Sequence, residues 1–241
     1  MSTEAQPDVE AVYARGTFPF LGLELLVQRG VLIPRPETEL LAQEALRALP
    51  EGSPVTVIDV CCGSGNIACA IAALRPQSRV FAADLTVPCV ELAQKNAQKL
   101  GLQGRLEVRQ GDLFAPLQGL GLEGQVDLIT CNPPYISTGR LEKERAELLS
   151  GEPREAFDGG PYGLSIHQRV IKEAVPLLKI GGRLMFEFGL GQERQMTALF
   201  GRAKNFSDLH FVSNASGAPR VAVAVRVTPP ETQNLNAEQG A

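Results

Sequence analysis

Apolar residues in the middle of the chain form short runs that alternate with stretches of helical periodicity. The runs predict seven strands, over residues 55–60, 79–83, 106–109, 126–131, 183–188, 208–212 and 220–227. The periodic stretches predict helices over residues 66–74, 87–100, 166–178 and 192–200. Because strands and helices alternate, we expect a mostly parallel, doubly wound α/β sheet with helices on both faces.

The two ends of this pattern depart from the alternation. The connection between residues 208–212 and 220–227 is too short for a crossover helix, so we expect these strands to form an antiparallel hairpin. Near the other end, residues 18–33 contain two apolar runs separated by Gln28-Arg29-Gly30, which predicts an N-terminal β-hairpin. A helical period follows over residues 40–49, with Thr38 as the expected N-cap.

These elements divide the chain into four parts. Residues 1–16 are expected to be a flexible N-terminus, and residues 17–52 carry the N-terminal hairpin and helix. A turn-rich stretch around Gly52 then leads into the main α/β domain, residues 53–227. Residues 228–241 are polar and contain two prolines, which predicts a disordered tail.

Length and charge narrow the class of protein. The chain has 241 residues, enough for one α/β domain with a substantial core. Its net charge of −4 argues against a nucleic-acid partner, which requires clustered Lys and Arg. The five cysteines show no CxxC spacing, so neither a disulfide framework nor a zinc site is indicated. No apolar run reaches transmembrane length and the acidic first residues do not resemble a secretory signal, so we expect a cytoplasmic protein without a membrane partner.

Three successive strand ends carry residues suited to binding a nucleoside cofactor. Asp84 and Leu85 end the second strand of the domain, and Asp84 is placed to accept both hydroxyl protons of a ribose. Asp112 and Leu113 follow the third strand, where Asp112 is expected to accept from an adenine amino group. The first strand leads into a segment whose glycines allow close approach of a ligand to the backbone. Its candidate residues are Asp59, Cys61, Cys62, Gly63, Ser64 and Gly65.

Two cofactors use a site of this kind. Gly63-x-Gly65-x-x-Ala68 also matches the dinucleotide pattern of an NAD-dependent oxidoreductase. S-adenosyl-L-methionine (SAM) is favoured because Asp59 is expected to meet a ligand's ammonium group and Asp112 adds an adenine contact. The fourth strand also ends in a motif that does not suit hydride transfer.

That motif, Asn132-Pro133-Pro134-Tyr135, supplies the candidate catalytic residues. The Asn132 side-chain oxygen and the Pro133 carbonyl are each expected to accept one N–H of a planar –NH2 group, and the Tyr135 ring to stack on its face. The arrangement aims a neutral nitrogen without a strong base, which indicates methyl transfer. Neither His167, interpreted as a helix-surface residue, nor His210 is needed for this chemistry.

Several motifs together resemble the release-factor glutamine methyltransferase family (HemK/PrmC type) of class I SAM-dependent methyltransferases. They are LIPRPETE at 32–39, DVCCGSGNIA at 59–68, GDLF at 111–114, NPPYIS at 132–137, EPREAFDGG at 152–160 and EFG at 187–189 with Gln192. The resemblance covers residues 17–227 and implies a Rossmann-like methyltransferase sheet. It also implies that Cys61 to Gly65 and Asp84 bind SAM, that Leu113 lies beside adenine, and that Asn132 to Tyr135 hold a protein glutamine amide.

Two departures from the family pattern leave the substrate open. About 16 residues precede the shared region, so we expect a chain without the family's separate N-terminal helical domain, and Tyr162 stands where an Asp is expected. The alternative substrate is a small-molecule carboxylate, methylated on oxygen in a biosynthetic pathway, with Arg35, Arg140 and Arg154 as candidate contacts. Without the docking domain, the apolar face at residues 17–33 would favour a homodimer.

Overall fold

The computed structural model of the protein describes residues 8–143 and 152–229. Its centre is a seven-stranded sheet of order β5-β4-β3-β6-β7-β9-β8, in which β9 runs antiparallel to both β7 and β8 and the other pairs are parallel. The predicted doubly wound sheet and its C-terminal antiparallel hairpin are therefore confirmed. The strands are β3 (Val55–Val60), β4 (Ser78–Asp84), β5 (Leu106–Gln110), β6 (Val126–Cys131), β7 (Leu178–Glu187), β8 (Phe206–Ser213) and β9 (Pro219–Arg226).

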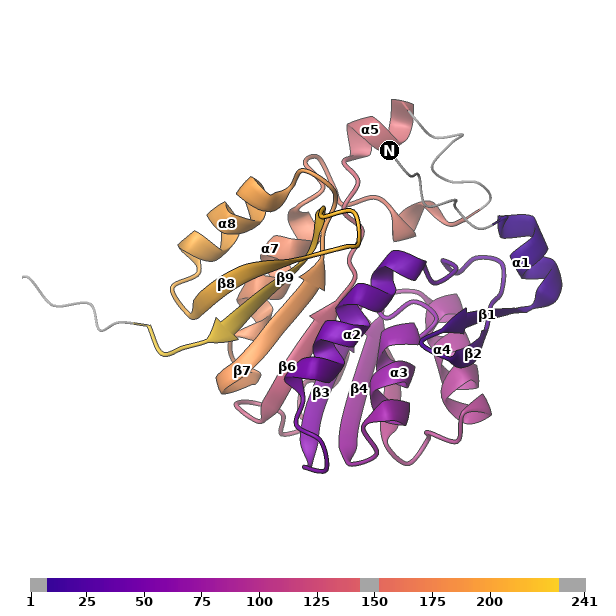
Figure 1. Cartoon of the computed structure of the whole chain (residues 1–241), viewed down its shortest axis with the longest axis horizontal. Coiled ribbons are helices and arrows are strands. Elements are labelled where there is room, and N and C mark those ends of the chain that lie inside the picture. Colours follow the sequence, from indigo (N-terminus) through magenta and orange to yellow (C-terminus); the bar gives the residue numbers. More distant parts are fainter. Residues whose placement is uncertain (1–7, 144–151, 230–241) are drawn as a thin grey trace, which may run out of the picture.

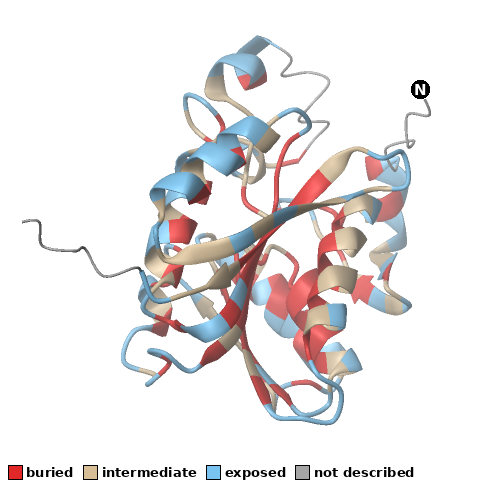
Figure 2. Ribbon diagram, turned by 60° about the vertical axis from the view of Figure 1, so that its left-hand side comes forward, coloured by how far each residue is buried: buried red, intermediate tan, exposed pale blue. Residues whose placement is uncertain are grey.

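Helices cover both faces of the sheet (Figure 1). Side chains alternate across each strand, so Val57 packs in one apolar cluster and its neighbour Ile58 packs in the other. The first cluster includes side chains of α2 (Glu39–Ala48), α3 (Asn66–Leu74) and α4 (Val87–Lys99). The second includes side chains of α7 (Ser165–Ala174) and α8 (Glu193–Arg202). Figure 2 shows the resulting buried layers on either side of the strands.

The short elements lie in the connections. They are the 3₁₀ turns η1 (Pro36–Thr38), η2 (Ala115–Leu117) and η3 (Arg154–Ala156) and the short helix α5 (Thr138–Lys143). No helix or strand was predicted from the sequence over η1 or η3. Both segments approach the carboxyl edge of the sheet, where the candidate site lies.

The expectation of a flexible N-terminus is wrong for residues 8–16, because Val9–Arg15 form the helix α1. The Asp8 side chain caps it by accepting from the backbone N–H of Ala11, and Gly16 ends it in a left-handed conformation. Val9 and Val12 face a small apolar cluster with Ile33, a spacing of three that marks one face of a helix. Residues 1–7 and 230–241 lie outside the described parts of the chain.

The N-terminal hairpin exists, but its turn lies elsewhere than predicted. β1 (Thr17–Phe20) pairs antiparallel with β2 (Leu23–Leu26), and the turn is Leu21-Gly22. Both turn residues have positive φ, 48° and 78°, as the tight two-residue hairpin turn requires. Gln28-Arg29-Gly30 instead belongs to the irregular segment after the hairpin. Phe20, Leu25 and Ile33 are fully buried within this chain, and the homodimer stays a prediction.

The carboxyl ends of β3 and β6 form the topological switch point of the sheet. From β3 the chain proceeds outward through β4 and β5, then returns to β6 on the other side of β3 and continues to β7. Open α/β sheets bind ligands in the crevice at such a point. The glycine-rich loop follows β3 and Asn132 follows β6, so the fold brings the two candidate motifs to the same crevice.

An amide side chain on α4 connects the hairpin to this crevice. Asn96 is fully buried; its Nδ2 donates to the carbonyls of Ser64 (2.9 Å) and Leu26 (3.2 Å). Its Oδ1 accepts from the backbone N–H of Leu26 at 2.7 Å. One side chain thus connects β2, α4 and the glycine-rich loop.

Replacing Asn96 by Ala leaves these backbone groups without partners in the interior. We expect the variant to lose about 2–4 kcal/mol of unfolding free energy, since each buried unsatisfied group costs about 1–3 kcal/mol. Urea unfolding followed by circular dichroism measures the change. Gln98→Ala, an exposed position on the same helix, is the control and should change stability little. Equal stability of the two variants would contradict this role for Asn96.

Candidate active site

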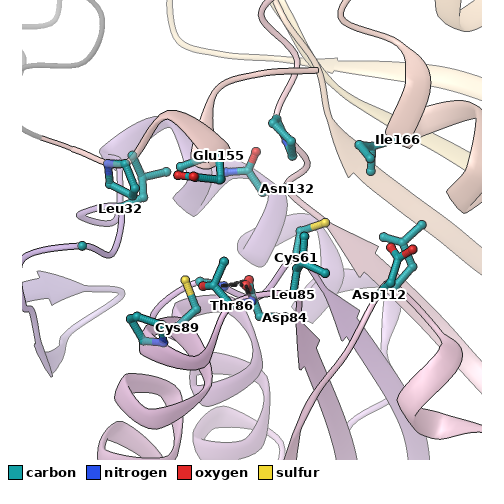
Figure 3. Close-up of a pocket in the computed structure, with 17 residues that line it drawn as sticks. Leu32, Cys61, Asp84, Leu85, Thr86, Cys89, Asp112, Asn132, Glu155 and Ile166 are labelled. Atoms are coloured by element: carbon teal, nitrogen blue, oxygen red, sulfur yellow. Dashed lines mark hydrogen bonds between the residues drawn. The ribbon is translucent and has the colours of Figure 1, made fainter. Parts of the chain in front are cut away.

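A cavity of about 380 Å³ lies over the carboxyl ends of the strands at the switch point (Figure 3). Eight of the predicted site residues line it: Cys61, Gly63, Asp84, Leu85, Asp112, Leu113, Asn132 and Pro134. The cofactor candidates and the amide of Asn132 therefore share one cavity. The other lining residues were not assigned to the site from the sequence, and they are Gly30, Leu32, Thr86, Pro88, Cys89, Pro153, Glu155, Ala156 and Ile166.

Asp84 is fixed in the cavity by the loop that it faces. One of its carboxylate oxygens accepts from the backbone N–H of Gly63 at 2.9 Å, and the other accepts from that of Thr86 at 3.1 Å. These contacts hold the carboxylate between the first and second strand ends. A carboxylate has further lone pairs, so it can still accept hydroxyl protons from a ligand.

Left-handed backbone shapes the loop after β3. Gly63 has φ 54° and open space where a Cβ would lie, whereas a Cβ on Gly65 would come within 2.9 Å of Cβ of Ala93. Gly65 is therefore required for packing against α4 and does not line the cavity. Cys61 and Leu113 also have positive φ, 56° and 48°, although they are not glycines. Both line the cavity, and strained backbone of this kind concentrates at ligand sites.

The expectation that Asp59 meets a ligand's ammonium group is wrong. Asp59 is the fifth residue of β3 rather than part of the loop, and it is fully buried. Its oxygens accept from the backbone N–H of Ala68 at 3.2 Å and from the hydroxyl of Thr130 at 2.8 Å. Burial raises the pKa of Asp59 to about 7. The residue supports the start of α3 from below, and Cys62 and Ser64 are likewise buried and lie outside the cavity lining.

Asp112 lines the cavity but already has a partner. Both of its oxygens lie 3.0 Å from guanidinium nitrogens of Arg169 on α7. Any contact with a ligand would share the carboxylate with Arg169.

The NPPY residues divide between the cavity and the interior. Asn132 and Pro134 line the cavity, whereas Pro133 and Tyr135 do not. The Tyr135 hydroxyl donates to Oε1 of Glu187 at 3.2 Å, and the Arg220 guanidinium lies 5.7 Å from its ring centroid. Burial raises the pKa of the Tyr135 phenol. Tyr135 therefore supports the motif through Glu187 and Arg220, and its position outside the cavity lining argues against the predicted stacking of its ring on a substrate.

Two residues that the sequence analysis did not place in the site support this motif. The Thr38 hydroxyl donates to Oε2 of Glu187 at 2.8 Å and accepts from Nδ2 of Asn132 at 3.1 Å, so it makes no N-cap bond to α2. Glu187 is 1% exposed and ends β7. The only sequence signal for either was its place in the motifs LIPRPETE and EFG.

The expectation that His167 lies on a helix surface is wrong, because the residue is fully buried. It shares the buried stripe of α7 with Val170, Ile171 and Ala174, a spacing of three, four and seven that predicts an inward position. Its Nε2 lies 2.9 Å from the Glu187 carbonyl, and burial lowers its pKa to about 4.

Two of the arginines considered for a carboxylate substrate are paired within the protein. Arg35 forms an ion pair with the buried Glu152, whose other oxygen accepts from the backbone N–H of Ile33. Arg154 lies 2.9 Å from Asp158. These contacts neutralise the charges that a carboxylate substrate would need.

Known proteins with similar sequences are methyltransferases. A family profile described as "Methyltransferase domain" matches residues 51–208. The release factor glutamine methyltransferase of Geobacter sulfurreducens is 38% identical over 209 residues, covering 87% of this chain and 70% of that protein. That of Moorella thermoacetica is 37% identical, covering 89% and 74%.

Solved structures share the fold at low sequence identity. The hMettl16 catalytic domain in complex with an RNA hairpin has a TM-score of 0.66 and 18% identity, covering 87% of this chain and 77% of that one. Within the described ranges 8–143 and 152–229, no helix combines the length and the apolar character that crossing a membrane requires.

The buried Asp59 predicts a specific pH dependence of stability. Its pKa is about 7 in the folded protein and about 3.9 when unfolded, so the folded protein binds the proton more tightly. Its contribution to stability is fully present below the unfolded value and is lost as pH rises through 7. Between pH 5 and pH 8, wild type should lose about 1–3 kcal/mol of unfolding free energy relative to Asp59→Asn.

Urea unfolding of wild type and Asp59→Asn across this pH range measures the difference between their unfolding free energies. The titration of every group that the two proteins share cancels in this difference. A difference that stays constant from pH 5 to pH 8 would contradict the raised pKa of Asp59.

Proposed function

The chain belongs to the family of release factor glutamine methyltransferases, and from this premise we propose that it methylates the side-chain amide nitrogen of a protein glutamine. Membership makes it a SAM-dependent methyltransferase. The observation that carries the substrate proposal is that Asn132 lines the same cavity as Asp84, while its amide is held from behind by Thr38.

The cavity fits the cofactor by its open space and by the acceptor groups that line it. Space is open beside Gly63, where a Cβ would meet no atom within 4 Å, and the Asp84 carboxylate faces the same space. We assign Asp84 to the ribose hydroxyls, the backbone of Cys61 to Gly65 to the amino-acid end, and Leu113 to a face of the adenine. When bound, SAM supplies an electrophilic methyl group. Asp59 acts only by holding the loop and the start of α3.

Asn132 orients the acceptor. An amide nitrogen is a poor nucleophile because its lone pair is delocalised into the carbonyl. A hydrogen bond accepted by the Asn132 Oδ1 would fix an N–H group of the substrate and stabilise the positive charge that grows on nitrogen. Pro133 does not line the cavity, so its carbonyl is not assigned the predicted contact. No strong base is required, which fits a site whose buried His167 has a lowered pKa and contacts only the interior.

The backbone of the motif is held in place by Gln192. Its Oε1 accepts from the backbone N–H of Gly189 at 2.8 Å, and its Nε2 donates to the Tyr135 carbonyl at 3.1 Å. A Cβ on Gly163 would lie 2.2 Å from that same carbonyl, so the Gly160–Gly163 turn packs directly against the motif. These contacts leave little freedom for Asn132 to move away from the substrate.

A carboxylate substrate is disfavoured by the same geometry. An ionised carboxylate has no donors and would face the acceptor oxygen of Asn132. The pairing of Arg35 with Glu152 and of Arg154 with Asp158 leaves each of these charges already balanced.

The direct test is a methyl-transfer assay followed by mass spectrometry. Purified peptide chain release factor, a glutamine peptide, small amides and small carboxylic acids are each offered with SAM. A gain of one methyl on the release-factor glutamine supports the proposal. Transfer to a small acid without transfer to any amide would overturn it.

Asn132→Ala should strongly reduce transfer while leaving cofactor binding nearly unchanged. We expect kcat to fall by roughly 10²–10³-fold, as for loss of one group that stabilises transition-state charge. The dissociation constant for SAM, measured by calorimetry, should change less than about threefold, since the ribose contact comes from Asp84. Asn205→Ala, which removes the same amide after α8, is the control. Equal loss of binding and transfer would contradict this role.

A further inference from the structure

Asn132 and four further side chains meet at the end of β7, and we call these five the Glu187 cluster: Thr38, Asn132, Tyr135, Glu187 and Arg220. They come from η1, the loop after β6, the end of β7 and the start of β9. Of the five, only Asn132 lines the cavity. The other four therefore act on a ligand only through Asn132.

The direction of each hydrogen bond in the cluster is fixed by chemistry. Arg220 can only donate, and its guanidinium lies 3.3 Å from Oε1 of Glu187. An ionised carboxylate can only accept, so the Thr38 hydroxyl must use its one proton toward Oε2 of Glu187. The Thr38 oxygen is then left as an acceptor for its other neighbour.

That neighbour is the Asn132 amide. Because Thr38 offers only an acceptor, the amide must turn its NH2 group toward Thr38, as observed at 3.1 Å. The Oδ1 atom is then the polar atom that remains for the cavity. The two ends of an Asn amide are similar in shape, so without this constraint both orientations would be accessible.

Three groups donate hydrogen bonds to Glu187, namely Thr38, Tyr135 and Arg220, and a carboxyl group surrounded by donors is favoured in its ionised, acceptor-only form. Burial raises its pKa, and Arg220, Thr38 and Tyr135 oppose that shift by interacting with the charged form. The remaining charged group nearby, Glu37, acts in the same direction as burial.

We propose that Glu187 is a positioning residue that acts through Thr38 to hold the Asn132 amide with its oxygen toward the acceptor substrate. It thereby selects a substrate that donates hydrogen bonds, such as an amide, over one that only accepts them. The inference extends the proposed function, but the orientation of Asn132 is a property of the protein alone and can be measured without a substrate.

Glu187→Gln tests the direction of the bonds. Arg220 must still meet an oxygen, so the new amide turns its NH2 group toward Thr38. Thr38 then accepts from residue 187 and donates to Asn132, whose amide reverses and presents NH2 to the cavity. We expect kcat on an amide substrate to fall roughly 10²-fold with the SAM dissociation constant unchanged.

Two substitutions at Thr38 distinguish the effect of its hydroxyl group from the effect of its packing. Thr38→Val keeps the shape but removes the hydroxyl, and should lower kcat roughly 10-fold. Thr38→Ser keeps the hydroxyl and should restore kcat to within about threefold of wild type. Glu91→Gln on the exposed side of α4 and Thr197→Val on α8 are the matched controls and should behave as wild type.

The substrate-free readout is the solvent exchange of the Asn132 side-chain NH2 protons, observed by NMR in protein labelled with ¹⁵N-asparagine. Its signals are assigned by their absence in Asn132→Ala. Exchange should be slow in wild type and Thr38→Ser, and at least about 10-fold faster in Thr38→Val and Glu187→Gln, because the NH2 group loses its buried acceptor.

The outcomes separate the two proposals. Unchanged exchange in both Thr38→Val and Glu187→Gln would overturn the positioning role, whatever the enzyme methylates. Slow exchange in wild type together with faster exchange in these two variants would support the positioning role. If wild type then methylated no amide, only the proposed function would fail. Equal loss of kcat in Thr38→Ser and Thr38→Val would also overturn it, because packing rather than the hydroxyl would then be responsible.

Discussion

A buried carboxylate needs donors, and in this protein that requirement brings the substrate side of the site together. Glu187 is almost without exposed surface, and an isolated charge there would cost far more free energy than the fold can supply. Its donors come from η1, from the loop after β6 and from β9. Removing one partner of a buried ion pair typically costs about 3–5 kcal/mol, so the Glu187 cluster and the position of Asn132 are maintained together.

The cofactor side rests on a different constraint, which is backbone conformation. Cys61, Gly63, Gly65 and Leu113 all adopt positive φ at the ends of β3 and β5. For Cys61 and Leu113 this costs of order 1–3 kcal/mol each, offset by the surrounding packing. The strain turns the loops away from the strand direction and opens the cavity, while Asp59 and Asn96 hold the loop from below and from α4.

The sequence predicted the sheet, its helices and most of the cavity lining, because strand ends on a parallel sheet converge by rule. The errors have physical reasons. Asp59 was expected to meet a ligand because the sequence does not show which side of the sheet a residue near a strand end faces. His167 was expected on the surface because its polar residue type was given more weight than its helical spacing. The hairpin turn was misplaced because Leu21 at positive φ carries no sequence signal. Thr38, Glu187 and Arg220 were not assigned because their contacts join residues as much as 149 positions apart.

That separation along the chain has a consequence for how activity appears during folding. The cofactor side is built from one continuous stretch, β3 to the turn after β5, whereas the Glu187 cluster needs η1 near the beginning and Arg220 near the end. Contacts of long sequence separation form late, because the loop between them must first be closed. We therefore expect the nucleoside half of the cavity to become organised earlier in folding than the Glu187 cluster, which is complete only when β9 has joined the sheet.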